Sequence, residues 1–242
     1  MKNYLISGVS KGLGLKLTNL ALEVGFTIYG ISRSKTKEVE ILLEKYPNHF
    51  FWKSLDLSDT NLDVKKEIFK DFVSNKIHLD GFVNNAALAY DDIITNLNLE
   101  KLETMYRANV FAPMLMTKYA IRNMIFNKTK GSILHLSSIS VHTGYKGLAM
   151  YASTKGALEA FSKNTAREWG ENGIRSNAVV AGFMETDMSS GLTIDQKNRI
   201  YNRTSLKKAT TMESVANTIL FLLSEKAESI TGQNIFVDSG TI

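Results

Sequence analysis

The feature that most constrains this chain is a regular alternation of short apolar runs with helical stretches across its 242 residues. Runs such as residues 132–137 and 174–180 are mostly apolar rather than alternating, which is typical of strands covered by helices on both faces. Repeated strand–helix units favour a parallel sheet with right-handed crossovers. The sequence therefore predicts a single α/β domain over residues 1–242, with a doubly wound parallel sheet of about seven strands.

The elements expected from this pattern follow one another without a linker or an internal repeat. Strands are expected over residues 3–7, 26–31, 50–55, 79–83, 132–137, 174–180 and 234–237. Helices are expected near 13–24, 36–46, 59–75, 99–126, 149–171 and 212–224. The stretch from Gly182 to Thr211 contains no expected strand. Long irregular insertions in compact domains tend to be lids or binding loops, so we expect a substrate lid near residues 183–210.

Composition excludes several classes of protein. The chain has no cysteine, which rules out disulfides, thiolate catalysis and cysteine-type metal sites. Its four histidines, including His135 and His142, lack metal-like spacing. No apolar run reaches the roughly 18 residues that cross a bilayer, and the first residues are typical of a strand rather than of a signal peptide. We therefore expect a cytoplasmic protein with no metal site and no membrane segment.

The charged residues are spread along the chain. The formal net charge is +5, from 29 Lys and Arg against 24 Asp and Glu. Nucleic-acid binding usually requires basic residues clustered on one element, and here they are scattered. We therefore expect no nucleic-acid partner. A mildly basic surface does attract anionic ligands such as phosphorylated cofactors.

A glycine-rich turn follows the first expected strand and opens the first expected helix. Glycines at such a junction allow a tight turn and a close approach of the backbone to phosphate, which the helix N-terminus faces. The turn therefore predicts a dinucleotide cofactor. Its contributing residues would be Gly8, Ser10, Lys11, Gly12, Leu13 and Gly14.

The end of the second strand indicates which nicotinamide cofactor is preferred. An Asp or Glu there would accept hydrogen bonds from a free ribose 2′-hydroxyl. The strand instead ends in Ile-Ser-Arg-Ser, with Arg33 and no acid. Arg33, together with Lys11 in the glycine turn, would hold a 2′-phosphate. The alternative is that both bases only face solvent; we expect NADP(H) rather than NAD(H).

Three polar residues in the second half of the chain suggest proton transfer. Tyr151 and Lys155 are four residues apart, so on a helix the phenol and the ammonium share one face. A cation beside a phenol stabilises the phenolate, so we expect a tyrosine pKa below its ordinary value of about 10. Ser138 follows an apolar strand and would emerge at the carboxyl edge of the sheet, where ligands bind in such folds. The pair alone is also typical of a solvated helix face.

These features together resemble the short-chain dehydrogenase/reductase family, from about residue 3 to residue 240. The resemblance implies a Rossmann-like fold. It implies a catalytic tetrad at Asn109, Ser138, Tyr151 and Lys155. It also implies cofactor contacts from Tyr151 and Lys155, and further ones from Asp56, Leu57, Asn85, Ala86, Ala87, Met184 and Thr186.

Two positions depart from the family pattern. Ala87 replaces the final glycine of the family's Asn-Asn-Ala-Gly segment, and alanine is poorly suited there if the backbone needs a positive φ. Ala181 replaces a proline before Gly182, which predicts a looser start to the lid. Neither departure touches the tetrad.

The resemblance also implies a mechanism. In the reductive direction Ser138 would bind the carbonyl oxygen, and Tyr151 would give that oxygen a proton. Lys155 would hold the nicotinamide ribose and lower the tyrosine pKa. Asn109 would hold a water in a proton relay or, as buried helix asparagines often do, only satisfy backbone groups. Ser137 competes with Ser138, but side-chain alternation along the strand favours Ser138.

Within the family, the segment spacing is most similar to bacterial 3-oxoacyl-(acyl carrier protein) reductases of fatty acid biosynthesis. That similarity implies reduction of a 3-oxoacyl thioester by NADPH, with an acyl carrier protein as a partner. Lys128 and Lys130 would dock this acidic protein. The similarity also implies a homotetramer packed through the helix that starts near Met150, which carries small residues.

Two other functions remain open at this stage. One is reduction or oxidation of a free sugar, polyol or sugar nucleotide, because the lid mixes apolar and polar residues. The other is a sensor that binds NADP(H) without turnover, which is disfavoured because no tetrad member is lost. Further candidates for the substrate pocket are Tyr90, His142, Tyr145 and Met188.

Overall fold

The computed structural model describes residues 1–74, 76–186 and 191–242 of the chain. Its strands form one parallel sheet in the order β3-β2-β1-β4-β5-β6-β7. They are β1 (Asn3–Ser7), β2 (Thr27–Ser32), β3 (Phe50–Ser54), β4 (Gly81–Asn84), β5 (Ser132–Ser138), β6 (Arg175–Ala181) and β7 (Asn234–Val237). The predicted doubly wound α/β fold is confirmed, and each strand lies within two residues of its expected bounds.

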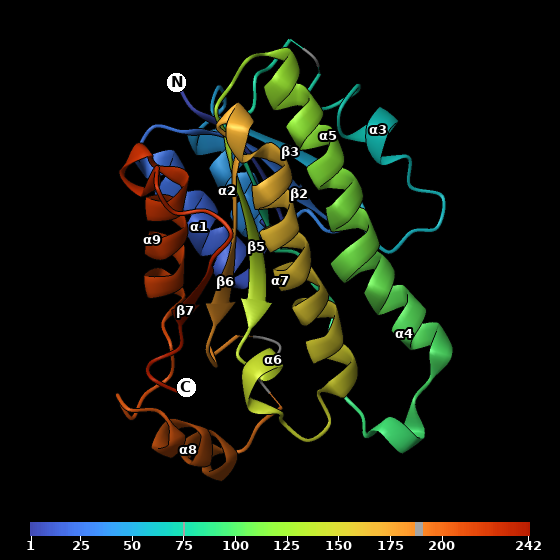
Figure 1. Cartoon of the computed structure of the whole chain (residues 1–242), viewed down its shortest axis with the longest axis vertical. Coiled ribbons are helices and arrows are strands. Elements are labelled where there is room, and N and C mark those ends of the chain that lie inside the picture. The colour runs from blue at the N-terminus through green and yellow to red at the C-terminus, as the bar shows by residue number, and fades with distance from the viewer. Residues whose placement is uncertain (75, 187–190) are drawn as a thin grey trace.

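Helices cover both faces of the sheet (Figure 1). On one face lie α1 (Gly12–Glu23), α2 (Lys37–Lys45) and α9 (Met212–Leu223), which share a core cluster with the inner strands. On the other face lie α3 (Val64–Glu67), α4 (Leu99–Tyr106), α5 (Ala112–Phe126) and α7 (Ala149–Trp169). Residues of α3 and α5 form a second core cluster on that face. Figure 1 also shows α6 (Ser140–Thr143) and α8 (Ile194–Arg203) below the arrowheads of β5 and β6.

The helix expected over residues 59–75 is mostly absent, because only α3 forms in that stretch. The apolar side chains of Val64, Ile68 and Val73 are all buried, so the helical spacing of apolar residues was real. Lys53, on the neighbouring strand β3, donates from Nζ to the Glu67 carbonyl at 2.7 Å. Beyond this point the chain continues in turns rather than in a regular helix.

The helix expected over residues 99–126 is interrupted in its middle. A π-helical turn over Arg107–Phe111 separates α4 from α5. Single π-turns inside helices occur frequently at functional sites. Here the turn carries Asn109, whose side chain is completely buried. The expected run is therefore three consecutive helical segments, and the irregular one holds a predicted tetrad residue.

Two further properties hold for the described residues. None of their helices combines the length and the apolar character that crossing a membrane requires. Within the same residues, His, Asp and Glu side chains form no group of three or more that could hold a metal ion.

Candidate active site

A pocket with a volume of about 600 Å³ opens where the carboxyl ends of the strands meet the helices. Its walls come from the glycine turn, from the ends of β2, β3 and β4, and from the start of α7. Every cofactor residue expected from the sequence lines it: Gly8, Ser10, Lys11, Gly12, Leu13, Gly14, Arg33, Asp56, Leu57, Asn85, Ala86, Ala87, Tyr151, Lys155, Met184 and Thr186. Segments far apart in the chain therefore form one cleft.

The glycine turn has a shape that only glycine permits. Gly8 has φ +78°, and its N–H donates to the Ile31 carbonyl at 2.7 Å, which ties the turn to β2. A Cβ on Gly14 would lie 1.9 Å from the Gly8 carbonyl oxygen, so the turn and α1 are in direct contact. A Cβ on Gly12 would meet nothing closer than 4.0 Å. This open face at the start of α1 fits the phosphates of a dinucleotide.

The segment after β4 is fastened to the same turn. The Ser7 hydroxyl accepts hydrogen bonds from the backbone N–H groups of Asn85 and Ala86, both at 3.1 Å. Asn85 Nδ2 donates to the Ser7 and Gly8 carbonyls, each at 3.1 Å. Ser7 was not identified from the sequence as a site residue, although it directly precedes the first glycine of the turn. Ala87 is not among the described residues with positive φ, so alanine fits there without strain.

Arg33 and Asp56 line the pocket just after the ends of β2 and β3. Arg33 is exposed. Asp56 Oδ1 accepts hydrogen bonds from the Ser58 backbone N–H at 2.8 Å and from its hydroxyl at 2.6 Å. Partial burial acts to raise the pKa of Asp56, but the bonds from Ser58 and the charge of Arg33 outweigh it and lower that pKa. The carboxylate therefore stays ionised, and the guanidinium lies close enough to influence it.

Ser138 ends β5 at the carboxyl edge of the sheet, directly after Leu136 and Ser137, which line the pocket. Its Oγ accepts a hydrogen bond from the Ser140 backbone N–H at 3.2 Å and another from the Ser140 hydroxyl at 3.0 Å. With its acceptor positions used in this way, the Ser138 hydroxyl keeps its own proton for a ligand oxygen. Ser140 was not expected from the sequence, although its place two residues after Ser138 is the spacing of local serine turns.

Tyr151 and Lys155 face the pocket from the first turns of α7, with Lys155 Nζ 5.7 Å from the centre of the Tyr151 ring. The expected lowering of the tyrosine pKa is wrong for this structure. Burial, followed by the negative charge of Asp91, raises the pKa of Tyr151 to about 12. The edge of the ring that lines the pocket is accessible, but protein surrounds the rest. The phenol therefore holds its proton at neutral pH.

Lys155 is nearly completely buried, and its Nζ donates to the Leu136 carbonyl at 2.7 Å. Burial lowers the pKa of Lys155 from 10.5 to about 8. Loss of water thus disfavours both the phenolate and the ammonium. This is why the spacing of the two residues alone predicted the wrong direction for the pKa of Tyr151. Near pH 7 the arrangement consists of a neutral phenol beside a cationic amine.

Asn109 uses its amide on the protein itself. Oδ1 accepts from the Leu88 N–H at 2.8 Å, and Nδ2 donates to the Leu88 carbonyl at 2.8 Å and to Thr154 Oγ1 at 3.1 Å. These bonds match the second alternative, in which a buried asparagine satisfies backbone groups. Asn109 joins the π-helical turn both to the segment that follows β4 and to α7, between Tyr151 and Lys155.

The expected lid begins as regular structure. β6 extends through Ala181, whose carbonyl accepts from the Ile139 N–H at 2.9 Å, so replacement of proline leaves no loose start. Met184 and Thr186 line the pocket. Tyr201 of α8 donates a short hydrogen bond to Glu185, and Lys197 Nζ lies 3.7 Å from the same carboxylate. The lid therefore contains a helix that was not expected.

Several expected contacts are not made. Met188 lies outside the described residues. Tyr90, His142 and Tyr145 are not among the residues that line the pocket; the His142 ring contacts Glu159 and Phe236 instead.

Lys128 and Lys130 precede β5, so they lie at its amino end, whereas the pocket opens at the carboxyl ends of the strands. In Figure 1 α5 ends at the top of the molecule, whereas the arrowhead of β5 points down toward α6. Within one chain, these two lysines cannot dock a carrier protein at the mouth of the pocket.

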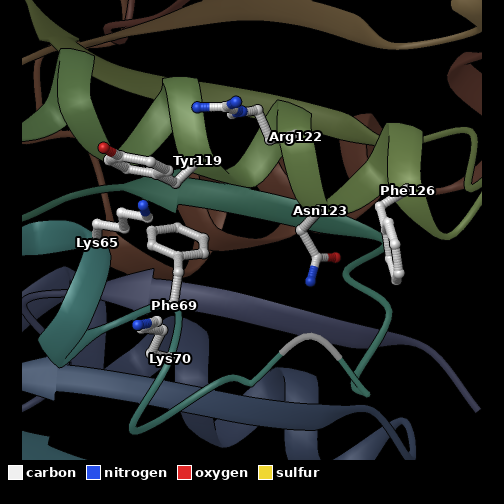
Figure 2. Close-up of a pocket in the computed structure, with 7 residues that line it drawn as sticks. All are labelled: Lys65, Phe69, Lys70, Tyr119, Arg122, Asn123 and Phe126. Carbon is white, nitrogen blue, oxygen red and sulfur yellow. The ribbon is translucent and has the colours of Figure 1, made fainter.

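A second, smaller hollow of about 260 Å³ lies between α3 and α5 (Figure 2). The rings of Phe69 and Tyr119 meet there at 5.7 Å, and the Asn123 side chain bonds to the backbone of Leu79 and Ile77. The remaining lining residues are Lys65, Lys70, Arg122 and Phe126. No residue expected to take part in chemistry lines this hollow, so the larger pocket is the candidate active site.

Comparisons with known proteins agree with this geometry. Residues 8–241 match the family described as enoyl-(acyl carrier protein) reductase. The chain is 31% identical over 241 residues to the 3-oxoacyl-[acyl-carrier-protein] reductase FabG of Buchnera aphidicola subsp. Schizaphis graminum (strain Sg), covering 99% of this chain and 96% of that protein.

Two solved structures have a similar fold. One is ElxO with NADP bound, 29% identical with a TM-score of 0.86, covering 99% of this chain and 98% of the other. The other is 4-hydroxyisoleucine dehydrogenase complexed with NADH, 23% identical with a TM-score of 0.89, covering 100% and 98%. The second likeness concerns the fold alone. The chain belongs to the short-chain dehydrogenase/reductase family and is an oxidoreductase that acts on CH–OH or C=O groups.

Proposed function

We propose that this protein is an NADPH-dependent carbonyl reductase whose substrate is a 3-oxoacyl thioester. One observation carries the proposal: Tyr151, a phenol that holds its proton at neutral pH, lines the same pocket as the predicted cofactor residues, and Ser138, whose hydroxyl keeps its own proton, directly follows Ser137, which lines that pocket as well. Two hydroxyl donors suit a substrate oxygen that gains a proton. Relatives that match over almost their full length are named 3-oxoacyl-[acyl-carrier-protein] reductases.

NADPH, when bound, supplies the hydride that reduces the carbonyl carbon. Ser138 donates a hydrogen bond to the carbonyl oxygen and orients it. Tyr151 transfers its phenolic proton to that oxygen, so that carbonyl, hydride and proton together give the hydroxyl product. General acid catalysis of this kind contributes about 10²–10⁴-fold in rate. The raised pKa of Tyr151 favours this direction, because the group starts as an acid.

Lys155 and Asn109 have supporting roles. The Lys155 ammonium offsets negative charge on the phenolate that remains after proton transfer, and the same amine would hold the ribose of a bound cofactor. Its pKa of about 8 keeps the amine charged at neutral pH and lets it lose that charge in mildly alkaline solution. Asn109 bonds to the backbone at Leu88 and to Thr154, which ties the segment after β4 to the helix that carries Tyr151 and Lys155.

The preference for NADPH rests on Arg33. Its exposed guanidinium lies at the end of β2, where an acid would favour a free 2′-hydroxyl. A 2′-phosphate would place its charge against the arginine. ElxO, a protein of the same fold, has been solved with NADP bound, which is consistent with this preference.

The proposed substrate and the proposed oligomeric state are both inferred from the relatives. A carrier-bound thioester is favoured by their names, and a free sugar, polyol or sugar nucleotide is the alternative. The docking surface for an acyl carrier protein must lie elsewhere than on Lys128 and Lys130 of the same chain. For the homotetramer we note exposed Phe111, Leu115 and Phe126 on the helical layer that includes α7. Light scattering of the purified protein measures that assembly.

A substrate panel tests the proposal. NADPH consumption is followed with an acetoacetyl thioester, with keto-sugars and with simple ketones. We expect oxidation of NADPH with the thioester. Failure of every thioester together with turnover of a keto-sugar would favour the alternative substrate class. Tight NADPH binding without turnover of any carbonyl would contradict the reductase and favour a sensor.

A further inference from the structure

Glu159 on α7 is a buried carboxylate that the mechanism does not use. Three side chains from three other elements bond to it. Ser137, near the end of β5, donates a short hydrogen bond to Oε1. His142 Nε2, in α6, lies 3.1 Å from Oε1 and 3.0 Å from Oε2, and Asn234 Nδ2, in β7, donates to Oε2 at 2.6 Å.

A buried carboxylate is costly unless its oxygens are fully bonded, so this cluster is a specific arrangement rather than a chance contact. Glu159 is 8% exposed, and both of its oxygens are used. It follows Tyr151 by eight residues and Lys155 by four, which places the three side chains on one face of α7. The helix that carries the proton donor therefore also carries Glu159. We call Glu159, together with its partners Ser137 and His142, the clamp.

The clamp holds both sides of Ser138. Ser137 directly precedes it, and its side chain points to the opposite face of the strand. His142 belongs to the short helix that follows, and Ser140 of the same helix donates both hydrogen bonds to Ser138. Figure 1 shows this helix, α6, directly beyond the end of β5. Movement of Ser137 or of α6 would therefore turn the Ser138 hydroxyl.

We propose that Glu159 is a positioning residue for Ser138: through Ser137 and His142 it fixes the direction of the serine hydroxyl relative to Tyr151. The proposal rests on the proposed reductase function. Glu159 itself touches neither substrate nor cofactor. Its bond to Asn234 has a different effect, because that bond holds β7 on the side away from Ser138.

A hydrolytic triad is the other use of serine, histidine and carboxylate, and the geometry excludes it here. In such a triad the serine bonds to histidine, which removes its proton. The Ser137 hydroxyl instead donates to the carboxylate, and His142 bonds to the same carboxylate through Nε2. The serine is therefore held rather than activated.

Two matched variants test the proposal. Ser137→Ala and Asn234→Ala each remove one hydrogen bond to the same carboxylate, one beside Ser138 and one away from it. NADPH-linked reduction of an acetoacetyl thioester is measured for kcat and for both KM values, and stability is measured by chemical denaturation. We expect kcat of Ser137→Ala to fall at least about tenfold with the KM for NADPH unchanged. We expect Asn234→Ala to keep kcat within about twofold of wild type, at a similar loss of stability.

The possible results separate the two claims. Equal kcat values in the two variants, with an active wild type, would overturn the positioning role and leave the reductase intact. A fall in kcat that tracks the loss of stability in both variants would also overturn it. A wild-type protein without turnover would overturn the proposed function, and the positioning role with it.

Discussion

The two sides of the pocket are built differently. On the cofactor side, backbone and side-chain bonds among Ser7, Gly8 and Asn85 fasten one strand end to the next. On the lid side, α8 has no buried residue and is tied to Glu185 by exposed contacts from Tyr201 and Lys197. Backbone turns and buried hydrogen bonds therefore fix the shape of the cofactor side. On the lid side, exposed side-chain contacts hold the surface that would meet the substrate.

The largest effect on cofactor binding is expected from Gly14→Ala. The added Cβ would lie 1.9 Å from the Gly8 carbonyl oxygen and 2.5 Å from Asn85 Nδ2, so the turn must move. We expect NADPH binding weakened more than about 100-fold, since overpacking costs about 1–3 kcal/mol or more. Fluorescence titration measures the dissociation constant.

Gly170→Ala is the matched control, because a Cβ there meets nothing within 4 Å and the backbone is helical. That variant should bind NADPH as wild type does. Wild-type binding by Gly14→Ala would show that the tight contact between the turn and α1 is unnecessary.

Arg33→Asp should reverse the cofactor preference. The change removes a charge-assisted donor to a 2′-phosphate and adds an acceptor for a free 2′-hydroxyl. We expect the ratio of NADPH to NADH affinity to fall by about 10- to 100-fold, the range for a hydrogen bond to a charged group. Titration with both cofactors measures it. An unchanged ratio would contradict a role of Arg33 in cofactor preference. Equal affinities of the wild type for NADPH and NADH would contradict it as well.

The sequence predicted the cofactor side well because its signals are local. The apolar runs located the seven strands of the described residues, and Gly8, Gly12 and Gly14 located the turn that lines the pocket. The lid was less predictable, because no face of α8 is buried to give a periodic apolar pattern. Its capping box, Thr193 with Gln196, was the one local signal of that helix.

Tertiary contacts account for the remaining errors. The capture of the Glu67 carbonyl by Lys53 cannot be inferred from residues 59–75 themselves. The pKa of Tyr151 depends on burial and on Asp91, which the spacing of Tyr151 and Lys155 does not show. Likewise, the partners of Asn109 come from distant segments.

His135 is a buried residue of β5, two residues before Ser137, which lines the pocket. It makes the stability of the fold sensitive to acid. Both of its ring nitrogens are buried without a hydrogen-bond partner among the described residues. Burial, with the charge of Lys155, lowers the pKa of His135 from 6.5 to about 3. Between these values the unfolded chain binds more protons than the folded one, so stability falls as pH falls. From pH 7 to pH 5 we expect a loss of about 2 kcal/mol from this residue.

Urea unfolding of wild type and His135→Leu at both pH values measures that loss. The variant should be at least as stable as wild type at pH 7, because it removes two unsatisfied polar atoms, and the difference between the two proteins should grow at pH 5. A constant difference would mean that His135 binds a proton in the folded state.

The smallest effect is expected on the lid side. Tyr201→Phe removes the bond to Glu185 at an exposed position, where water competes for both groups and the contact contributes little. We expect the KM for the carbonyl substrate to rise a few-fold and NADPH affinity to stay unchanged. Steady-state kinetics measure both. Tyr90→Phe, which loses two surface hydrogen bonds but lies outside the lid, is the control. Weaker NADPH binding in Tyr201→Phe would contradict the separation of the two sides.

The most direct test of the central claim is the turnover of Tyr151→Phe. The variant keeps the ring and loses only the proton that the account transfers to the substrate oxygen. We predict that kcat for NADPH-linked carbonyl reduction falls about 10²–10⁴-fold, with NADPH affinity and unfolding free energy close to wild type. Wild-type turnover by a folded Tyr151→Phe protein would contradict the account.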